Sequence, residues 1–471
     1  MTQKTEAKTE RTHPWRDNIE AITVSIIIIV LFKYFILEAY KIPTGSMQPT
    51  LMGWDDGKGG GVFDRVLVDK FSFHYRDPER FEVVVFRYPL DQSKNFIKRV
   101  VGVGPESFEI RRGDLYKAPL GTPAGSTAFE IVRRPRSVMD EQLKSLDVAG
   151  EWRLDGADWR SVGQSISAEG PGRATFPRTS TSIRDHYSDG YPGKLGALQN
   201  ATGKRSGLNN VGDVRVSGMI AASADCKEFF VELREGSATY RLALPGPGSD
   251  AAAKTSIRFR DASNRSAGLE THALEAWQLP PGEPVEFMAQ NVDDLLELEV
   301  NGKVLLTMEV PSARESACTV TLATTGGGAE FTELGIARDI YYTSVSQRMT
   351  HWDIPEDHYL MLGDNTQDSS DGRDWSLTRY ELPTADGEGE IVRGNNRPTE
   401  NPLIVPNSDG KATVYLHDEF GERRVFARDE AQAMGVEDHP LVPRSLLRGR
   451  AVLVVWPLAP SLDVYRLKWV R

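Results

Sequence analysis

The strongest constraint on this chain is an apolar run near its N-terminus, residues 21–39, which reads AITVSIIIIVLFKYFILEA. About 20 apolar residues cross the hydrocarbon core of a bilayer, and no other run in the sequence is that long. Trp15 and Tyr40 would suit the two interfaces. Lys33 interrupts the run near its outer end, where its long side chain can reach the headgroups. The sequence therefore predicts a single transmembrane helix over residues 19–39.

A secretory signal peptide is the alternative for the same segment. No small-x-small cleavage site follows it, which argues against removal. The tail before the run carries basic residues, and basic flanks remain on the cytoplasmic side. We therefore expect a cytoplasmic N-terminus, with most of the chain on the outer side of the membrane. The basic residues of this tail are Lys4, Lys8, Arg11 and Arg16.

Composition excludes several functional classes. The net charge of −11 over 471 residues argues against nucleic acid as a partner, because phosphate binding needs a basic face. The eight histidines are scattered without an HExxH pair, so we expect no zinc or similar metal site. Cys226 and Cys318 are the two cysteines, too few for a disulfide framework. They would pair only outside the cytoplasm, and otherwise would be two buried thiols.

Strand-like runs dominate the rest of the chain. Residues 81–88 (FEVVVFRY) and 95–103 (NFIKRVVGV) read as buried strands that end at proline or glycine. Two further runs with the same buried-strand pattern come much later in the chain, at residues 357–362 (DHYLML) and 451–456 (AVLVVW). Between the two sets, residues 209–340 show about eight short alternating strands, with an Asn301-Gly302 hairpin turn. This pattern predicts an inserted β-sandwich of jelly-roll type.

The predicted fold class is thus mostly β: one transmembrane helix, an all-β core and an inserted sandwich. The expected segments follow in chain order: a cytoplasmic tail (1–18), the transmembrane helix (19–39), a first core segment (40–111), a Gly/Pro/Ser-rich insertion (112–208), the sandwich (209–340), a second core segment (341–381), a polar insertion (382–445) and a third core segment (446–471).

A rigid turn follows the apolar run directly. Ser46 stands after Gly45 in the sequence IPTGSMQPTL, between two prolines. Proline fixes φ and glycine permits unusual φ, so a short side chain can be held exposed at a defined angle. At a membrane surface, such a serine is placed to act as a nucleophile on a chain that leaves the bilayer.

A serine nucleophile needs a base, and Lys98 is the candidate. It lies in the strand NFIKRVV with Phe96 and Val100 on its own face. Burial disfavours the ammonium form, so the pKa of a buried lysine falls towards neutrality. Ser-Lys dyads are a known variant of nucleophilic catalysis. A Ser-His-Asp triad and an exposed Lys98 remain the alternatives on spacing alone.

The third element is the polar segment at residues 363–375, GDNTQDSSDGRDW. It superficially resembles a calcium loop, but the central glycine and the terminal glutamate are missing at the required spacing. Asp371 and Arg373 can form an ion pair that holds the loop, and Ser369 can orient Lys98 through a hydrogen bond. The alternative is a polar surface turn.

Taken together and in this order, these segments resemble the bacterial type I signal peptidases (leader peptidases), the Ser/Lys-dyad peptidases of family S26. The resemblance rests on YKIPTGSMQPTL, DRVLVDKF, VVVFRYP, NFIKRVVGVGPE, GDNTQDSSDGRDW and GRAVLVVWP. It covers about residues 15–112, 340–380 and 446–471, and leaves out both insertions.

The resemblance implies a membrane-anchored serine endopeptidase that removes signal peptides from exported preproteins without a cofactor. Its partners would be those signal peptides and membrane lipid. The inserted sandwich lies outside the resemblance, and we expect it to be an accessory domain for an unknown ligand. The implied roles are nucleophile for Ser46, general base for Lys98, oxyanion donors for Thr44 and the Ser46 amide, orientation and bracing for Ser369, Asp371 and Arg373, and substrate pockets for Tyr40, Ile42, Met47, Leu51, Val85, Phe96 and Ile97.

Two turns depart from the family pattern: residues 103–106 (VGPE) replace Leu-Pro-Gly-Asp, and residues 79–82 (ERFE) replace Arg-Gly-Asp.

Two other functions are alternatives to a signal peptidase. A Ser-Lys self-cleaving repressor would be soluble and would carry a DNA-binding module. A membrane-tethered carbohydrate or protein binder would use the sandwich, with a degenerate peptidase core.

Overall fold

The structure is a computed structural model of the chain. It describes residues 14–35, 37–55, 61–156, 158–179, 182–186, 207–264, 268–313, 316–343, 349–383, 389–395, 402–408, 410–459 and 464–471. The tail at residues 1–13, including Lys4, Lys8 and Arg11, lies outside the described residues.

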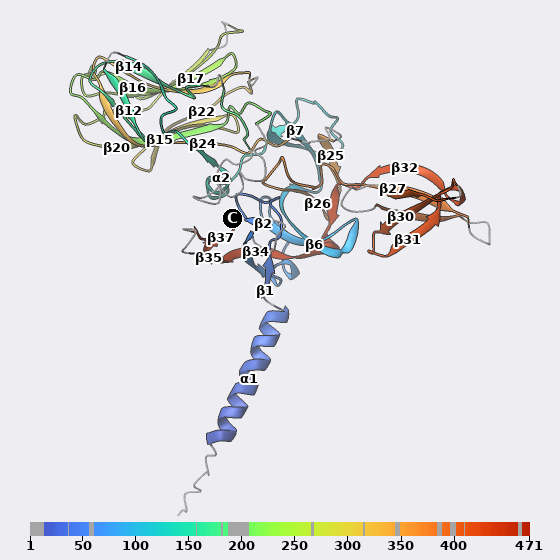
Figure 1. Cartoon of the computed structure of the whole chain (residues 1–471). Coiled ribbons are helices and arrows are strands. Elements are labelled where there is room, and N and C mark those ends of the chain that lie inside the picture. The colour runs from blue at the N-terminus through green and yellow to red at the C-terminus, as the bar shows by residue number, and fades with distance from the viewer. Residues whose placement is uncertain are drawn as a thin grey trace, which may run out of the picture.

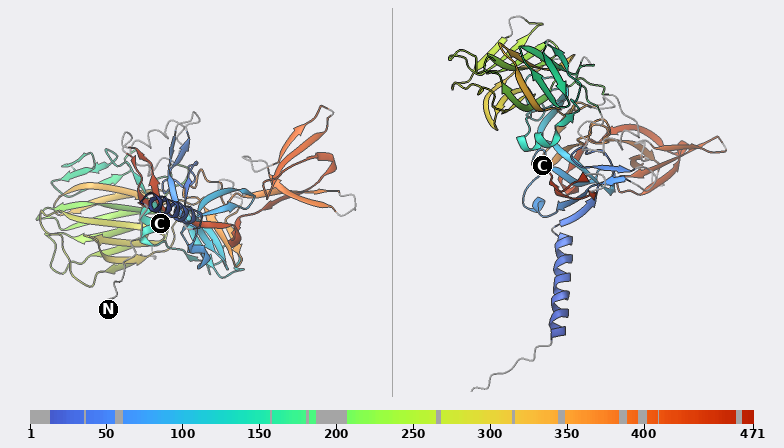
Figure 2. Two further views of the ribbon diagram at one scale, coloured as in Figure 1. Left: turned by 90° about the horizontal axis from the view of Figure 1, so that it is seen from below. Right: turned by 60° about the vertical axis from the view of Figure 1, so that its left-hand side comes forward.

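One long helix projects from a group of three β modules (Figures 1 and 2). Helix α1 runs from Pro14 to Phe35, and strand β1 starts at Leu37. The predicted helix over residues 19–39 is therefore wrong at its C-terminal end, because residues 37–39 pair with β4 as part of a sheet. Across the described part of the chain, no helix combines the length and the apolar character that a membrane span requires.

The central module is an eight-stranded sheet that brings together the two sets of strand-like runs in the sequence. Its order is β1-β4-β34-β5-β6-β26-β33, with β37 paired to β34. Because alternate residues face opposite sides, the sheet buries one apolar cluster on each face. The strands are β1 (Leu37–Lys41), β4 (Arg65–Asp69), β5 (Val83–Tyr88), β6 (Asp91–Val103), β26 (His358–Leu362), β33 (Leu441–Pro443), β34 (Leu447–Trp456) and β37 (Lys468–Trp469).

Smaller elements extend this module. A four-stranded sheet, in the order β25-β7-β8-β9, contributes a third apolar cluster. Its strands are β7 (Glu106–Arg111), β8 (Asp114–Ala118), β9 (Glu130–Ile131) and β25 (His351–Ile354). The remaining elements are the pair β2 (Gly53–Asp55) and β3 (Gly61–Phe63), the pair β35 (Leu458–Ala459) and β36 (Val464–Tyr465), and the 3-10 turns η1 (Ser72–His74) and η3 (Arg444–Leu446).

The second module is the expected β-sandwich (Figure 1). Two antiparallel sheets, β12-β13-β24-β15-β20-β21-β22 with β10, and β11-β14-β23-β16-β17-β18-β19, share one large apolar core. Helix α2 (Arg136–Gln142) precedes β10 in the chain. The strands are β10 (Lys144–Leu146), β11 (Arg153–Asp155), β12 (Trp159–Val162), β13 (Ser165–Ala168), β14 (Gly172–Phe176), β15 (Val214–Ala222), β16 (Glu228–Glu235), β17 (Ala238–Pro245), β18 (Ser256–Asp261), β19 (Gly268–His272), β20 (Val285–Val292), β21 (Leu295–Val300), β22 (Lys303–Glu309), β23 (Cys318–Thr325) and β24 (Ala329–Arg338).

The predicted boundary of the sandwich at residue 209 is wrong. Strands β10 to β14, between residues 144 and 176, join its two sheets. They are only three to five residues long, so each shows too few alternating positions to be recognised. Cys226 and Cys318 are both buried in the sandwich core, and no disulfide joins them.

The second insertion also folds. It forms a six-stranded sheet in the order β29-β30-β28-β27-β32, with β31 paired to β30, which extends from the central module on the side away from the sandwich (Figures 1 and 2). Its elements are β27 (Ser376–Leu382), β28 (Glu390–Asn395), β29 (Leu403–Pro406), β30 (Ala412–Asp418), β31 (Arg423–Ala427), η2 (Arg428–Glu430) and β32 (Gln432–Asp438).

Candidate active site

Ser46 lies in a tight turn between β1 and β2. The turn is closed by backbone hydrogen bonds from Gln48 N to Gly45 O (3.0 Å) and from Leu51 N to Met47 O (2.9 Å). Met47 and Leu51 are fully buried and anchor the turn to the central sheet, while Ser46 is half-buried. The proline and glycine pattern thus yields a fixed turn with a serine that stays accessible.

Thr44 is exposed two residues before Ser46. Gly53 packs directly against this part of the turn: a Cβ added there would lie 2.4 Å from Thr44 O and 2.5 Å from Ile42 O. Only glycine permits such a close backbone approach, so the position of Thr44 depends on Gly53.

Lys98 is buried on β6, opposite Val84 of β5. Its Nζ donates a hydrogen bond to Ser369 Oγ at 3.0 Å. Burial lowers the pKa of Lys98 to about 8; the nearby charge of Asp371 opposes this shift and that of Arg373 adds to it. A substantial fraction of this amine is therefore neutral near physiological pH, as a general base requires.

The loop at residues 363–375 is held by an ion pair inside the protein. Asp371 Oδ1 accepts from Arg373 Nε at 2.8 Å and Asp371 Oδ2 accepts from Arg373 Nη2 at 2.6 Å. Asp371 Oδ2 also accepts from Gly363 N at 2.9 Å. Burial by itself would raise the pKa of Asp371, but the charge and hydrogen bonds of Arg373 outweigh it and hold that pKa below its usual value. The loop is braced at both ends.

This loop also forms hydrogen bonds with the serine turn. Asn365 N donates to Ser46 O and Asn365 Nδ2 donates to Gly45 O, both at 3.0 Å. A Cβ on Gly363 would lie 2.5 Å from Ser46 O and 2.2 Å from Ser369 Oγ. The structure therefore brings Ser46, Ser369 and Lys98, which are far apart in the sequence, into one cluster.

Sequence reasoning missed the carboxylate that ties these elements together. Asp364 accepts from Arg99 Nε (2.9 Å) and Arg99 Nη2 (2.7 Å), and from Thr50 Oγ1 (2.5 Å). Arg99 directly follows Lys98, and Thr50 belongs to the serine turn. Asp364 and Asn365 both belong to the polar segment at residues 363–375 that stands out in the sequence. Their polar side chains in that segment were the sequence feature that could have marked them as site residues.

The expected substrate pocket residues divide between the two faces of the sheet. Six of them share the apolar cluster next to the Ser46 turn: Tyr40, Ile42, Met47, Leu51, Val85 and Ile97. Phe96 instead packs in the cluster on the opposite face, where its ring stacks on Tyr88 with centroids 4.3 Å apart. Alternation along β6 places Phe96 on the same side as Lys98 and Ile97 on the other.

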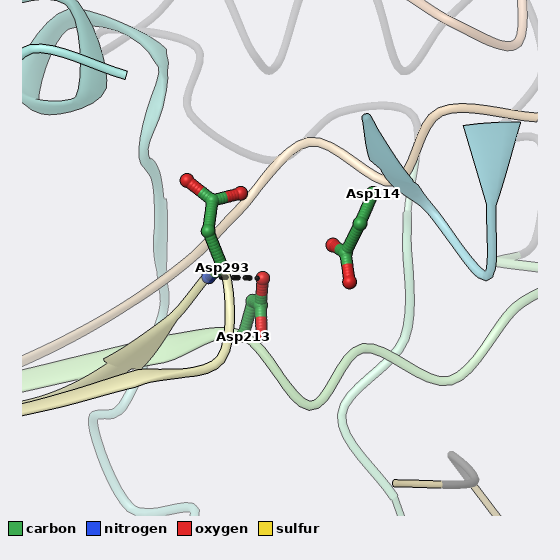
Figure 3. A group of neighbouring side chains, drawn as sticks. All are labelled: Asp114, Asp213 and Asp293. Carbon is green, nitrogen blue, oxygen red and sulfur yellow. Dashed lines mark hydrogen bonds between the residues drawn. The ribbon is translucent and has the colours of Figure 1, made fainter. Parts of the chain in front are cut away.

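A separate group of carboxylates lies where the sandwich meets β8. The ligand oxygens of Asp114, Asp213 and Asp293 lie within 4.8 Å of one another (Figure 3). Asp293 N donates to Asp213 Oδ2 at 2.9 Å, and the Asp293 carboxylate accepts from Arg134 Nη2 at 3.1 Å. Burial, followed by the charges of Asp114 and Asp293, raises the pKa of Asp213 well above its usual value. Arg134 thus compensates one of the three acids.

The sandwich also has an open cavity of about 950 Å³ between its edge strands β19 and β22. Trp277, Leu305 and Leu306 give it apolar walls, and His272, Asn301 and Lys303 line it with polar groups.

Known proteins resemble this chain around the same segments. A family model described as signal peptidase, peptidase S26, matches residues 15–137 and 281–390. Over these two stretches the chain is similar to the signal peptidases of the peptidase S26 family. The probable signal peptidase I-2 of Synechocystis sp. is 33% identical over 121 residues, 24% of this chain and 50% of that protein. The signal peptidase I of Pseudomonas fluorescens is 40% identical over 90 residues, 17% of this chain and 28% of that protein.

The chain spans about half or less of the length of these two relatives of the family. Two solved structures show a faint likeness as well. The Bacillus subtilis carbohydrate-binding module CBM66 has a TM-score of 0.25 at 8% identity, covering 41% of this chain and 98% of that one. Sheep galectin-11 in complex with glycerol has a TM-score of 0.21 at 11% identity, covering 27% of this chain and 92% of that one.

Proposed function

We propose that this chain is a membrane-anchored serine endopeptidase that cleaves signal peptides from exported preproteins, with Ser46 as nucleophile and Lys98 as general base. The observation that carries the proposal is the buried Lys98 amine, bonded to Ser369 within a loop that is itself bonded to the Ser46 turn. The same chemistry is consistent with the names of the relatives in the S26 family.

The mechanism begins with neutral Lys98, which accepts the proton of Ser46 as the serine oxygen attacks the scissile carbonyl. The Ser46 N–H and the Thr44 hydroxyl stabilise the oxyanion, a contribution of about 3 kcal/mol per donor in comparable sites. The protonated Lys98 then gives its proton to the leaving amine. In the second half, Lys98 activates a water that releases the acyl-enzyme.

Substrate recognition would use the apolar cluster beside the turn. Shallow apolar pockets suit the small residues of an A-x-A cleavage site. Tyr40, Ile42, Met47, Leu51, Val85 and Ile97 would line these pockets. An extended substrate segment would add along a sheet edge, where pockets read alternate side chains. Phe96 faces the Lys98 side and would contact substrate through that face alone.

The test is cleavage of a preprotein with an A-x-A site by purified full-length protein in detergent. Ser46→Ala and Lys98→Ala should each abolish cleavage. Lys94→Ala is the matched control, because Lys94 lies on the same strand with a side chain 51% exposed. Cleavage that survives in either active-site variant would remove that residue from the mechanism. An inactive wild type on several preproteins would refute the proposed function.

Membrane anchoring is the second element of the proposal, and its support is the apolar run at residues 21–39. The N-terminus would lie in the cytoplasm and the catalytic module on the outer, periplasmic side. Protease added to spheroplasts should digest the catalytic module and spare a tag at the N-terminus. Release of the full-length protein by alkaline carbonate would contradict anchoring.

The cavity between β19 and β22 favours an additional role, ligand binding by the sandwich. Mixed apolar and polar walls around a partly exposed indole suit a neutral ligand with both kinds of surface. We therefore place the unknown ligand of the insertion there. Screening oligosaccharides by thermal shift, with Trp277→Ala as the comparison, tests this role. A ligand that stabilises wild type and Trp277→Ala equally would contradict the placement.

A further inference from the structure

Helix α2 belongs to the insertion, and one of its residues contacts the central module. Gln142, the last residue of α2, is fully buried. Its Nε2 donates to Asp364 Oδ1 at 2.9 Å and to the hydroxyl of Tyr342 at 3.3 Å. Gln142 and Asp364 are 222 residues apart in the sequence, so this contact exists only because the insertion folds back onto the core.

Asp364 accepts hydrogen bonds from the residues that hold the catalytic groups in place. Arg99 bonds both of its oxygens, and Thr50 bonds Oδ2. A carboxylate has about four acceptor positions. Two are taken by Arg99, one by Thr50 and one by Gln142, so the Gln142 amide completes the set. Without it, a buried acceptor on Oδ1 would lose one of its partners.

The other end of Gln142 is linked to the sandwich. Its Oε1 accepts from Arg134 Nη1 at 3.4 Å. Arg134 in turn bonds Asp339, which follows β24, and Asp293, in the turn between β20 and β21. An unbroken series of buried polar contacts therefore runs from the sandwich to the catalytic loop.

The insertion region also holds the same loop at a second place. Gln367 Nε2 donates to the backbone carbonyl of Asp185 at 2.5 Å. Asp185 lies in the connection between the sandwich strands β14 and β15. Two separate segments of the insertion thus bond to the loop that carries Ser369.

We infer that Gln142 is a positioning residue for the peptidase, and that the insertion belongs to the support of the catalytic loop. The inference rests on the proposed Ser46/Lys98 function. Gln142 fixes the Asp364 carboxylate. Asp364 then fixes Arg99 beside Lys98, Thr50 in the serine turn, and the loop that presents Ser369. The insertion therefore sets the rate of the chemical step without touching the substrate.

Gln142→Met tests this role, because methionine keeps the length of the side chain and removes both amide groups. The expected result is a kcat lower by about tenfold or more at unchanged KM, since a hydrogen bond to a buried charged group is lost. Gln278→Leu is the matched control. Gln278 is an exposed amide of the same insertion that bonds Ser249 and does not contact the catalytic loop. It should keep wild-type kcat and KM.

A double-mutant cycle separates positioning from a general structural effect. Thr50→Val removes a second hydrogen bond to Asp364 with little change in shape. If both residues act through Asp364, the kcat losses of Gln142→Met and Thr50→Val should combine non-additively, whereas Gln278→Leu with Thr50→Val should be additive. If Gln142→Met fails to fold, Tyr342→Phe takes its place, because it removes only the hydroxyl that accepts from Gln142. A kcat lower by about twofold to threefold is then expected.

Wild-type kcat in folded Gln142→Met, or in Tyr342→Phe where it replaces that variant, would overturn the inference. So would a loss confined to KM, or strict additivity with Thr50→Val. Ser46→Ala in the same assay keeps the two proposals distinct. If Ser46→Ala retains cleavage, the proposed function has failed. If Ser46→Ala is inactive while Gln142→Met is fully active, only the role of the insertion has failed.

Discussion

Ser369→Ala is the sharpest test of how the buried lysine is held. The substitution removes the hydroxyl that accepts from Lys98 Nζ at 3.0 Å and adds nothing to the loop. A hydrogen bond to a charged group contributes about 1.5–3 kcal/mol. If the bond serves mainly to orient the amine towards Ser46, its loss should lower the plateau kcat by about tenfold to a hundredfold.

The same substitution should also move the pH profile. The pKa of Lys98 is about 8 with Ser369 in place, so kcat/KM of the wild type should rise with pH through that value. The ammonium loses more from the missing acceptor than the neutral amine does. Since about 1.4 kcal/mol corresponds to one pKa unit, the rising limb should shift towards acid by up to about one unit.

The assay is the initial rate of preprotein cleavage in detergent from pH 6 to pH 10, with kcat and KM resolved at each pH. Ser370→Ala is the control, because Ser370 is the exposed neighbour on the same loop. It should reproduce the wild-type profile. A Ser369→Ala profile with the wild-type plateau and the wild-type limb would refute the argument that this hydroxyl orients Lys98.

Two further predictions concern stability and the serine turn. Gly53→Ala should lower kcat by about tenfold and destabilise the fold by about 1–3 kcal/mol, because the added Cβ would lie 2.4 Å from Thr44 O. Thermal unfolding and cleavage kinetics measure the two effects. Wild-type values for both would contradict the prediction. Burial, with the charges of Glu235 and Asp293, raises the pKa of Asp294 to about 7. The folded state then binds more protons than the unfolded state between about pH 4 and 7, so the stability contributed by this group falls as pH rises through that window. Asp294→Asn should therefore stabilise the protein by about 1–2 kcal/mol at pH 8 and by much less at pH 4. Urea unfolding at the two pH values measures the difference. An equal effect at both pH values would contradict a raised pKa of Asp294 as the cause.

The inner strands of the central module, such as β5 and β26, could be predicted from sequence because they are largely buried on both faces. Val83, Val84, Val85 and Phe86 form a continuous apolar run, and such runs are distinctive even in a single sequence. The short strands at residues 144–176 could not be recognised in this way. Three of them, β10, β13 and β14, pair with β24 or β23, which follow much later in the chain.

Candidate site residues were accessible from sequence where a local constraint marked them. Pro43, Gly45 and Pro49 mark the Ser46 turn, and Phe96 and Val100 mark Lys98 as a residue of a buried strand. The family resemblance places Phe96 among the pocket residues, yet it packs on the opposite face of the sheet from the other six. Strand alternation gives the relative faces of Phe96 and Ile97, but only the folded sheet shows which face lies beside the serine turn.

The sequence alone determined the mostly β class of this protein, the serine turn and the lysine strand, because each depends on residues close together in the chain. The tertiary structure decided which distant groups meet. Asp364 collects Arg99, Thr50 and Gln142 from segments up to 314 residues away. No local pattern marks Gln142, since its partners are set by how the insertion packs on the core. A buried carboxylate needs partners from all sides, and a compact fold alone can supply them.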